Sequence, residues 1–241
     1  MIPDGLTSAL RAFRGMIPAM ATHVIGDVHG CHDELSELLD GLGPTSEDRL
    51  IFVGDLVVRG PDNAGVVRRF LDGDLESATV ILGNNEDKLR PTLAGDPTYA
   101  TPAVFETIRQ LSDAGILEAS LELFDRFPLL VELDDVVVAH AGVRPGIPMH
   151  AQARADLLKI KTVDGLPNGT MWWESYDGPA TVVFGHHVLR DPLQLPKAIG
   201  IDTGCVYGGR LTALTLETGV FTAVHARRTY YRHPGKAYLF E

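Results

Sequence analysis

One pattern recurs along this chain: a short apolar run ends, often through a glycine, in a side chain that can bind a metal. Short runs of Val, Ile, Leu and Phe bounded by glycine are typical of buried strands. The side chains that follow these runs are Asp27, His29, Asp55, Asn84, His140, His186 and Asp202. Because ligands gather at the carboxyl ends of strands in open α/β sheets, several such donors predict one shared site.

Helical patterns lie between the apolar runs. Residues 33–42 repeat leucine at helical intervals, and Asp33 is predicted as the N-cap. Residues 104–127 predict one or two helices with a break near Gly115. Two hairpins are also predicted, with turns at Asp134-Asp135 and around Thr218-Gly219. Strands that alternate with helices before a strand-rich C-terminal part predict an α/β protein with one or two mixed sheets.

The composition of the chain limits the kinds of molecule that it is expected to bind. The chain has 241 residues, of which 45% are hydrophobic and 22% charged, as in ordinary globular proteins. Its net charge of -11 argues against a nucleic-acid groove, because phosphate backbones demand a basic surface. A small phosphorylated substrate remains compatible, since bound metal ions supply local positive charge.

The lengths of the apolar runs and the number of cysteines predict the location and the domain organisation of the protein. No apolar run approaches the roughly 20 residues that span a bilayer, so no membrane association is expected. Residues 1–20 contain no continuous apolar stretch and are interpreted as an N-terminal arm, not a signal peptide. Residues 21–241 are expected to form a single domain. Two cysteines, Cys31 and Cys205, suggest no disulfide framework, and we therefore expect a cytoplasmic protein.

The donors also indicate a class of metal. Carboxylate and amide oxygens mixed with imidazole suit Mn, Fe or Zn better than Ca or Mg alone. A pair of divalent ions, roughly 3.5–4 Å apart, needs a bridging carboxylate and several terminal ligands. Six residues meet that need: Asp27, His29, Asp55, Asn84, His140 and His186.

Five motifs carry a resemblance to a known family. In order along the chain they read "GDVHG", "GDLVVRG", "GNNE", "HAG" and "FGHH". They resemble the signatures GDxHG, GDxxDRG, GNHE, H(A/G)G and GH of the phosphoprotein-phosphatase superfamily of dinuclear metallophosphoesterases. Within that superfamily, the chain is most similar to bacterial symmetrical diadenosine tetraphosphatases and to compact bacterial protein phosphatases. The resemblance implies a four-layer αββα sandwich with two mixed β-sheets.

The resemblance also implies roles for individual residues. It assigns Asp27 and His29 to one metal, Asp55 to the bridge between the metals, and Asn84, His140 and His186 to the second metal. Arg59 would clamp a phosphate oxygen, a task that suits the planar guanidinium. Two divalent ions are implied as cofactors, with Mn expected and Fe, Co or Zn as alternatives.

Two positions depart from the signatures. Asn85 stands where the family has the histidine credited with protonating the leaving group, and Val58 stands where protein phosphatases have an aspartate that orients this histidine. An amide cannot deliver that proton, although it can hydrogen-bond a phosphate oxygen. General-acid help is typically worth about 10²- to 10⁴-fold. A phosphoanhydride needs this help less than an alkyl phosphate does, because its leaving group is already a weak base.

The sequence therefore predicts a metal-dependent hydrolase of dinucleoside polyphosphates. We expect symmetrical cleavage of diadenosine tetraphosphate to two ADP, by in-line attack of a metal-bridging hydroxide, with Arg59 and Asn85 as catalytic residues. A Ser/Thr/Tyr protein phosphatase is the first alternative, favoured by the short segment between His140 and His186. A phosphate-binding pseudoenzyme without the general acid is the second.

Several further residues have two interpretations at this stage. Trp172 and Trp173 would stack on a nucleobase or pack in the core. Arg144 and Lys161 would contact phosphate or play no part in it, and His187 would donate a proton or pack. Asp202 is expected to support the structure and not to bind metal.

Overall fold

The computed structural model describes residues 20–163 and 169–232, which contain two five-stranded sheets. The first sheet has the order β10-β9-β1-β2-β3. Its strands are β1 (Thr22–Ile25), β2 (Arg49–Phe52), β3 (Thr79–Val80), β9 (Arg210–Thr215) and β10 (Val220–His225). Strands β1, β2 and β3 run parallel, whereas β9 is antiparallel to both β1 and β10, so this sheet is mixed.

The second sheet has the order β4-β5-β6-β8-β7. Its strands are β4 (Leu130–Leu133), β5 (Val136–Ala139), β6 (Thr181–Phe184), β7 (Leu193–Leu195) and β8 (Ala198–Gly200). Strands β5, β6 and β8 are parallel, and the two edge strands are antiparallel to their neighbours. Each sheet therefore contains three neighbouring parallel strands, at one side of the first sheet and in the centre of the second, whose carboxyl ends lie at the same edge.

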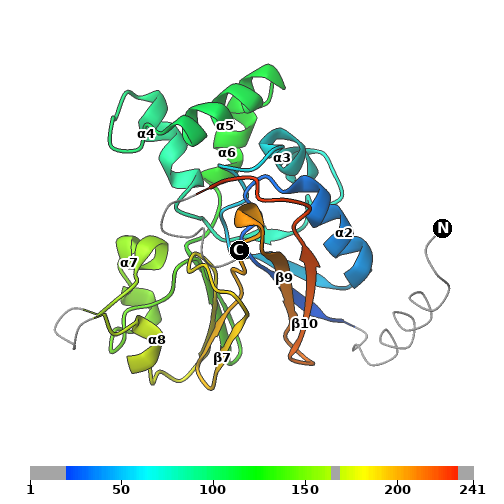
Figure 1. Cartoon of the computed structure of the whole chain (residues 1–241). Coiled ribbons are helices and arrows are strands. Elements are labelled where there is room, and N and C mark those ends of the chain that lie inside the picture. The colour runs from blue at the N-terminus through cyan, green and yellow to red at the C-terminus, as the bar shows by residue number, and fades with distance from the viewer. Residues whose placement is uncertain (1–19, 164–168, 233–241) are drawn as a thin grey trace.

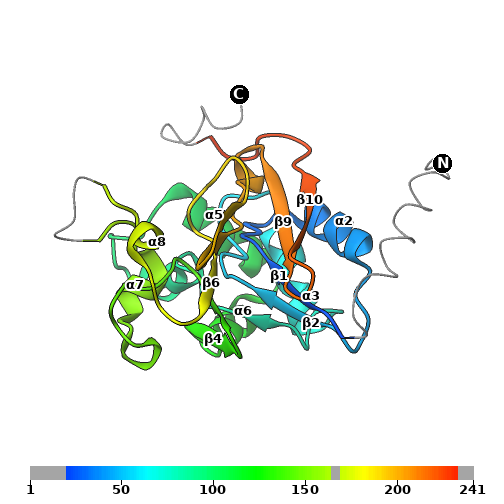
Figure 2. The ribbon, with the colours of Figure 1, turned by 90° about the horizontal axis from the view of Figure 1, so that it is seen from below.

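Helices cover the outer face of each sheet. On the first sheet lie α2 (His32–Leu42), α3 (Asn63–Leu71), α5 (Pro102–Asp113) and α6 (Leu117–Phe124). On the second lie α7 (Arg154–Lys159) and α8 (Trp172–Ser175). The remaining helical segments are α4 (Leu89–Leu93) and the short 3-10 turns η1 (Glu86–Lys88), η2 (Met149–Ala151) and η3 (Cys205–Tyr207). Figures 1 and 2 show α2 and α7–α8 on opposite sides of the molecule.

The two sheets pack face to face through an inter-sheet layer of branched side chains. Strand residues alternate between faces, so Val24 points into this layer while Ile25 packs under the outer helices. The same alternation places Val183 between the sheets and Phe184 against α8. This arrangement of helix, sheet, sheet and helix confirms the predicted αββα sandwich.

The helix predictions are confirmed except at one end. Two helices, α5 and α6, occupy the region predicted to break near Gly115, which has φ +71°. The predicted N-cap at Asp33 is wrong, because α2 begins at His32 and Cys31 is its N-cap. The Asp33 carboxylate instead pairs with the Arg227 guanidinium.

The predicted hairpins are confirmed, since β4–β5 turns at Asp134-Asp135 and β9–β10 turns at residues 216–219. Residues 1–19, the bulk of the predicted arm, lie outside the described residues. In the described part of the chain, no helix is both long enough and apolar enough to cross a membrane.

Candidate metal centre

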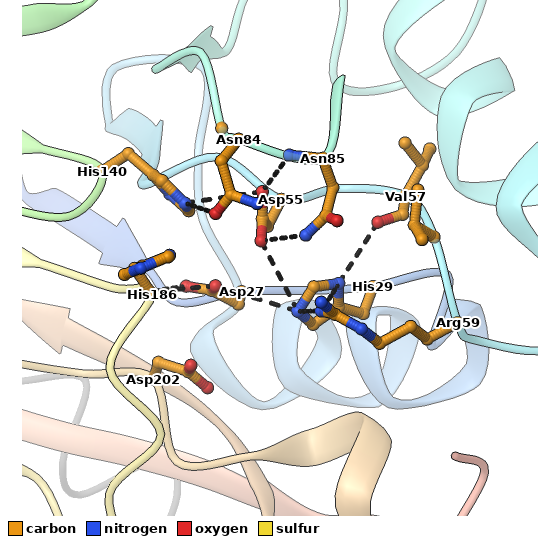
Figure 3. Close-up of polar contacts among 12 residues, drawn as sticks. Asp27, His29, Asp55, Val57, Arg59, Asn84, Asn85, His140, His186 and Asp202 are labelled. Atoms are coloured by element: carbon orange, nitrogen blue, oxygen red, sulfur yellow. Dashed lines mark hydrogen bonds and ion pairs between the residues drawn. The ribbon is translucent and has the colours of Figure 1, made fainter. Parts of the chain in front are cut away.

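The parallel strands of both sheets deliver the predicted donors to one place (Figure 3). From the first sheet come the residues that follow β1, β2 and β3, namely Asp27, His29, Asp55 and Asn84. From the second come His140 after β5 and His186 after β6. All six are largely buried, and the structure brings them together as the sequence predicted.

The backbone at three of these residues is strained. His29, Asp55 and His186 have φ values of 51°, 52° and 60°, in the left-handed region that residues other than glycine seldom adopt. Neighbouring glycines make room for this geometry: a Cβ on Gly185 would lie 2.0 Å from Oδ1 of Asp27. Such strain persists only where the surrounding structure holds it, and it is commonest at functional sites.

Asp55 lies at the centre of the cluster. Its Oδ2 is 3.7 Å from Nε2 of His29, and its Oδ1 is 3.5 Å from Nε2 of His140. Two groups of potential ligands therefore share this carboxylate: Asp27, His29 and Asp55 form one, and Asp55, His140 and His186 form the other. In Figure 3, Asp55 stands between His140 on one side and His29 on the other, as a bridging ligand would.

Hydrogen bonds orient the imidazoles for metal binding. Nδ1 of His29 donates to the carbonyl oxygen of Val57 at 3.2 Å, and Nδ1 of His140 donates to that of Val53 at 2.8 Å. Each ring therefore turns Nε2 toward the cluster, as metal-binding histidines do.

Two imidazole nitrogens in the cluster lack a suitable hydrogen-bond partner in the part of the chain that the structure describes, and this also fits a metal site. Nε2 of His140 lies 3.0 Å from Oδ1 of Asn84, so in the neutral ring two lone pairs face one another. Nε2 of His186 is buried and has no hydrogen-bond partner among the described residues. A buried cation would stabilise both arrangements, so the residues present fit the divalent ions that the sequence predicts.

The pKa shifts of the clustered side chains also indicate a site for a cation. Burial raises the pKa of Asp27, and the negative charges of Asp202 and Asp55 raise it further. Burial lowers the pKa of His29 to about 3, with a further contribution from the Arg59 cation. His29 is therefore neutral near pH 7, which is the form that binds metal. Buried carboxylates beside neutral imidazoles call for positive charge.

Glu86 is a site residue that the sequence interpretation did not single out, although it closes the "GNNE" motif. It is buried, and its carboxylate accepts hydrogen bonds from the backbone N–H groups of Asp55, Val57 and Gly83 at 3.0, 3.1 and 3.1 Å. Burial, together with the charge of Asp55, raises its pKa to about 8. Glu86 thus ties the loop after β2 to the loop after β3.

Arg59 sits on a strained loop beside the cluster. Val58 and Arg59 have φ values of 76° and 84°, and this is unusual for a β-branched residue such as Val58. Oδ1 of Asn63, at the start of α3, accepts from the Val58 N–H at 2.7 Å and holds the loop in this shape. Nη1 of Arg59 then reaches Nε2 of His29 at 2.9 Å. A guanidinium in this position would contact a phosphate bound at the centre.

Asn85 is held on two sides. Its Nδ2 and its backbone N–H both donate to the Asp55 carboxylate, the latter at 2.9 Å, while its Oδ1 accepts from Nζ of Lys88 at 2.8 Å. The lysine therefore fixes which end of the amide faces Asp55. A cation three residues after Asn85, in a helical turn, was a signal in the sequence that went unused.

The residues with two interpretations resolve as follows. Trp172 is fully buried in the core and donates from Nε1 to the carbonyl oxygen of Ala141, whereas Trp173 is partly buried and packs against this core by stacking on Phe184. Arg144 forms a two-pronged pair with Asp156, at 2.7 and 2.8 Å, and supports its own loop.

Three other residues keep a supporting or peripheral place. Nε2 of His187 donates to the carbonyl oxygen of Ile160 at 2.8 Å, which occupies the nitrogen that would carry a proton to substrate. Lys161 is exposed, and its positive charge is a minor cause of the lowered pKa of His186, after burial and the neighbouring His140 and His187. Asp202 is buried below Asp27 in Figure 3 and accepts from the Gly204 N–H at 3.0 Å.

Comparison with known proteins gives consistent matches. The sequence model of the calcineurin-like phosphoesterase family matches residues 20–216. Among curated relatives, the bis(5'-nucleosyl)-tetraphosphatase PrpE of Bacillus subtilis (strain 168) is 34% identical over 80% of this chain and 89% of its own. The protein of the same name from Bacillus velezensis is 32% identical over 88% and 95%, respectively. Both names carry the qualifier "asymmetrical", which differs from the symmetrical cleavage expected from the sequence.

Solved structures agree on the fold. A crystal structure provisionally described as that of a diadenosine tetraphosphatase aligns with a TM-score of 0.69 and 30% identity, covering 86% of this chain and 93% of that one. A serine/threonine phosphatase from Saccharomyces cerevisiae aligns with a TM-score of 0.61 and 16% identity, covering 95% and 89%. At that identity the second match shows a common fold alone.

Proposed function

Because the chain belongs to the calcineurin-like phosphoesterase family, we propose that this metallophosphoesterase uses two metal ions to hydrolyse the phosphoanhydride chain of dinucleoside tetraphosphates. The observation that carries the proposal is the position of Asp55, which offers one carboxylate oxygen to the imidazole of His29 and the other to that of His140. Relatives with the tetraphosphatase name match over most of the chain, which supports this class of substrate.

The donors divide between two ions in this proposal. Asp27 and His29 would hold the first, and Asn84, His140 and His186 the second, with Asp55 shared. The mixture of oxygen and imidazole donors favours Mn, and it also suits Fe, Co or Zn. When bound, such a pair activates water as a nucleophile and neutralises charge on the phosphoryl group.

The protein's own groups then position the substrate. Arg59 would donate a fork of hydrogen bonds to the oxygens of the reacting phosphate, and its strained loop holds the guanidinium close to His29. Asn85 donates from Nδ2 to Asp55, so its first task is to fix the orientation of that carboxylate. Neither group supplies a proton to a leaving group.

The absence of a proton donor at position 85 selects among substrates. His187, the other candidate, is engaged with the carbonyl oxygen of Ile160. A nucleotide released from a phosphoanhydride leaves as a phosphate with a second pKa near 6, so it departs without an acid. An alkoxide from phosphoserine needs a proton, and the missing acid costs about 10²- to 10⁴-fold there. This argument places a protein phosphatase second.

We propose asymmetrical cleavage, in place of the symmetrical cleavage expected from the sequence, because the curated relatives carry that qualifier in their names. The products from diadenosine tetraphosphate would be ATP and AMP. We also propose a cytoplasmic location, to which two buried, reduced cysteines are suited. A small phosphorylated molecule is the expected partner.

Product analysis tests the proposal directly. The Mn-loaded protein is incubated with diadenosine tetraphosphate and, separately, with a phosphoserine peptide, and products are separated by chromatography. ATP plus AMP is expected, with slower turnover of the peptide. Two ADP would refute asymmetry, and faster peptide turnover would favour a protein phosphatase. A metal-loaded protein that hydrolyses neither would be a phosphate-binding pseudoenzyme.

A further inference from the structure

A pocket of about 330 Å³ lies beside Arg59, next to the metal centre. Its walls come from two distant segments: the loop after β2 contributes Arg59, Gly60 and Pro61, and the residues after β10 contribute Arg228, Thr229 and Tyr230. Among these described lining residues, two are arginines and none is acidic. In a chain with a net charge of -11, a pocket with only positive charge is a local exception. We refer to it as the two-arginine pocket.

The second arginine, Arg228, is exposed and lies against a tyrosine that is anchored in the folded core. Cζ of Arg228 lies 5.3 Å from the ring centroid of Tyr230, within cation–π range. The Tyr230 hydroxyl donates to Oε1 of Glu34 at 2.7 Å, and Glu34 is fully buried in α2. Arg228 therefore rests on a tyrosine anchored inside the protein, so less side-chain entropy is lost when it binds a ligand.

Arg59 links the two-arginine pocket to the metal centre. This residue lines the pocket and also donates to His29 at 2.9 Å. Its Cζ lies 5.9 Å from the ring centroid of Tyr207 and 6.0 Å from that of Tyr231. A phosphate chain that reacts next to His29 would thus pass Arg59 and enter a space bounded by a second guanidinium.

We propose that the two-arginine pocket binds the polyphosphate of the substrate beyond the bond that is cleaved, with Arg228 contacting a phosphate that does not react. Two neighbouring guanidinium groups repel one another, and a phosphate between them relieves that repulsion while accepting paired hydrogen bonds. The proposal rests on the proposed function and deepens it, because it explains how a substrate with several phosphates would be preferred over one with a single phosphate.

The position of Arg228 in the chain supports a role in specificity. The family model matches residues 20–216, which include every predicted metal donor, whereas Arg228 and Tyr230 lie beyond it. The family's shared core therefore carries the metal centre, and a segment outside that core carries this wall of the pocket. A wall added in this way would distinguish substrates and leave the chemistry unchanged.

Two arginine variants test the proposal in the full-length, Mn-loaded protein. Arg228→Ala removes the second guanidinium from the pocket. Arg227→Ala is the matched control, because the Arg227 guanidinium pairs with Asp33 and Arg227 is absent from the described lining of the pocket. KM is measured for diadenosine tetraphosphate and for p-nitrophenyl phosphate, which has a single phosphate. In parallel, ADP is titrated as an inhibitor of p-nitrophenyl phosphate hydrolysis.

Loss of a charge-assisted hydrogen bond predicts a clear ratio. In Arg228→Ala, KM for the tetraphosphate should rise about fivefold to tenfold more than KM for p-nitrophenyl phosphate, and the inhibition constant of ADP should rise similarly. Arg227→Ala should change neither ratio by more than about twofold. Equal effects of Arg228→Ala on both substrates, with unchanged ADP inhibition, would overturn the inference.

The same measurements separate this inference from the proposed function. If the wild type does not cleave the tetraphosphate but ADP still inhibits in an Arg228-dependent way, the pocket stands and the proposed substrate falls. If the tetraphosphate is cleaved and Arg228→Ala alters neither KM ratio nor ADP inhibition, the substrate stands and the pocket falls.

Discussion

The two sheets contribute to the metal centre in different ways. One potential metal group, Asp27, His29 and Asp55, comes entirely from the first sheet, where β1 and β2 pair in parallel register. The other group, Asp55, His140 and His186, draws on both sheets. The geometry of the first group thus depends on strand pairing within one sheet, whereas that of the second also depends on how the sheets pack.

Packing between the sheets is a property of the inter-sheet layer. This layer consists of buried aliphatic residues from both sheets: Val24, Ile51, Val53, Ile81, Val138, Val183, Ile201 and Leu214. Close-packed interiors transmit small changes in volume to their surroundings. We therefore expect the two proposed metal sites to respond differently to the same kind of substitution.

The largest effect should come from the shared ligand. Asp55→Asn removes the charge that both groups use and should lower kcat/KM for p-nitrophenyl phosphate by at least about 10³-fold. His186→Asn removes one ligand of the second group and should leave the first metal bound. Metal content by mass spectrometry, at a fixed free Mn concentration, should fall from two toward zero in the first variant and toward one in the second.

Loss of both metals in His186→Asn would show that the two sites are not separable, and would break the comparison. Thermal melting of both variants distinguishes this result from unfolding.

An effect of intermediate size is expected at Asn85, because an amide stands where the family has its proton-donating histidine. Asn85→His should raise turnover of a phosphoserine peptide by about 10²-fold, the lower end of general-acid catalysis. Turnover of diadenosine tetraphosphate should change by less than about threefold, since its leaving group needs no acid. Steady-state kinetics on both substrates measures this.

Asn85→Gln, which retains an amide, is the control and should raise neither rate. An equal gain on both substrates would contradict the argument from leaving groups.

The smallest functional effect should come from the inter-sheet layer itself. Val183 lies between the sheets, and Val67 lies on the buried face of α3, in the core between the first sheet and its helices. Both side chains are fully buried, so Val183→Ala and Val67→Ala make the same change in two different layers. Each should lower the free energy of unfolding by about 2 kcal/mol. Val183→Ala alone should weaken the second Mn relative to the first, by about threefold to tenfold, in a calorimetric titration.

An equal loss of affinity at both sites in Val183→Ala, or the same change in Val67→Ala, would show that sheet packing does not distinguish the two metal groups.

Much of the fold was predictable because its signals are local. Runs that alternate between strand and helix periods, with glycine at their ends, predicted mixed sheets with helices, the break at Gly115 and both hairpins. The order of the four layers came from the family resemblance. The N-cap of α2 was not predictable from its own segment. Asp33 has the right chemistry for a cap, but the distant Arg227 draws its carboxylate outward.

The same division holds for the site. Asp27 and Asp55 follow neighbouring parallel strands of one sheet, so their meeting follows from parallel topology and needed only the sequence. Glu86 and Arg228 act through partners that the fold brings to them, and a single sequence does not display those contacts. Trp172 needed the structure for another reason: its sequence context was compatible with stacking on a nucleobase or with core packing, and its full burial decides for the core.

Glu86 has a consequence for how this edge of the protein opens. Its one carboxylate accepts N–H groups from Asp55 and Val57 on one loop and from Gly83 on the next. If one loop moved outward alone, its backbone N–H groups would lose their hydrogen bonds to the Glu86 carboxylate, which they share with the other loop. The two loops therefore behave as a single cooperative unit, protected from solvent exchange together or not at all.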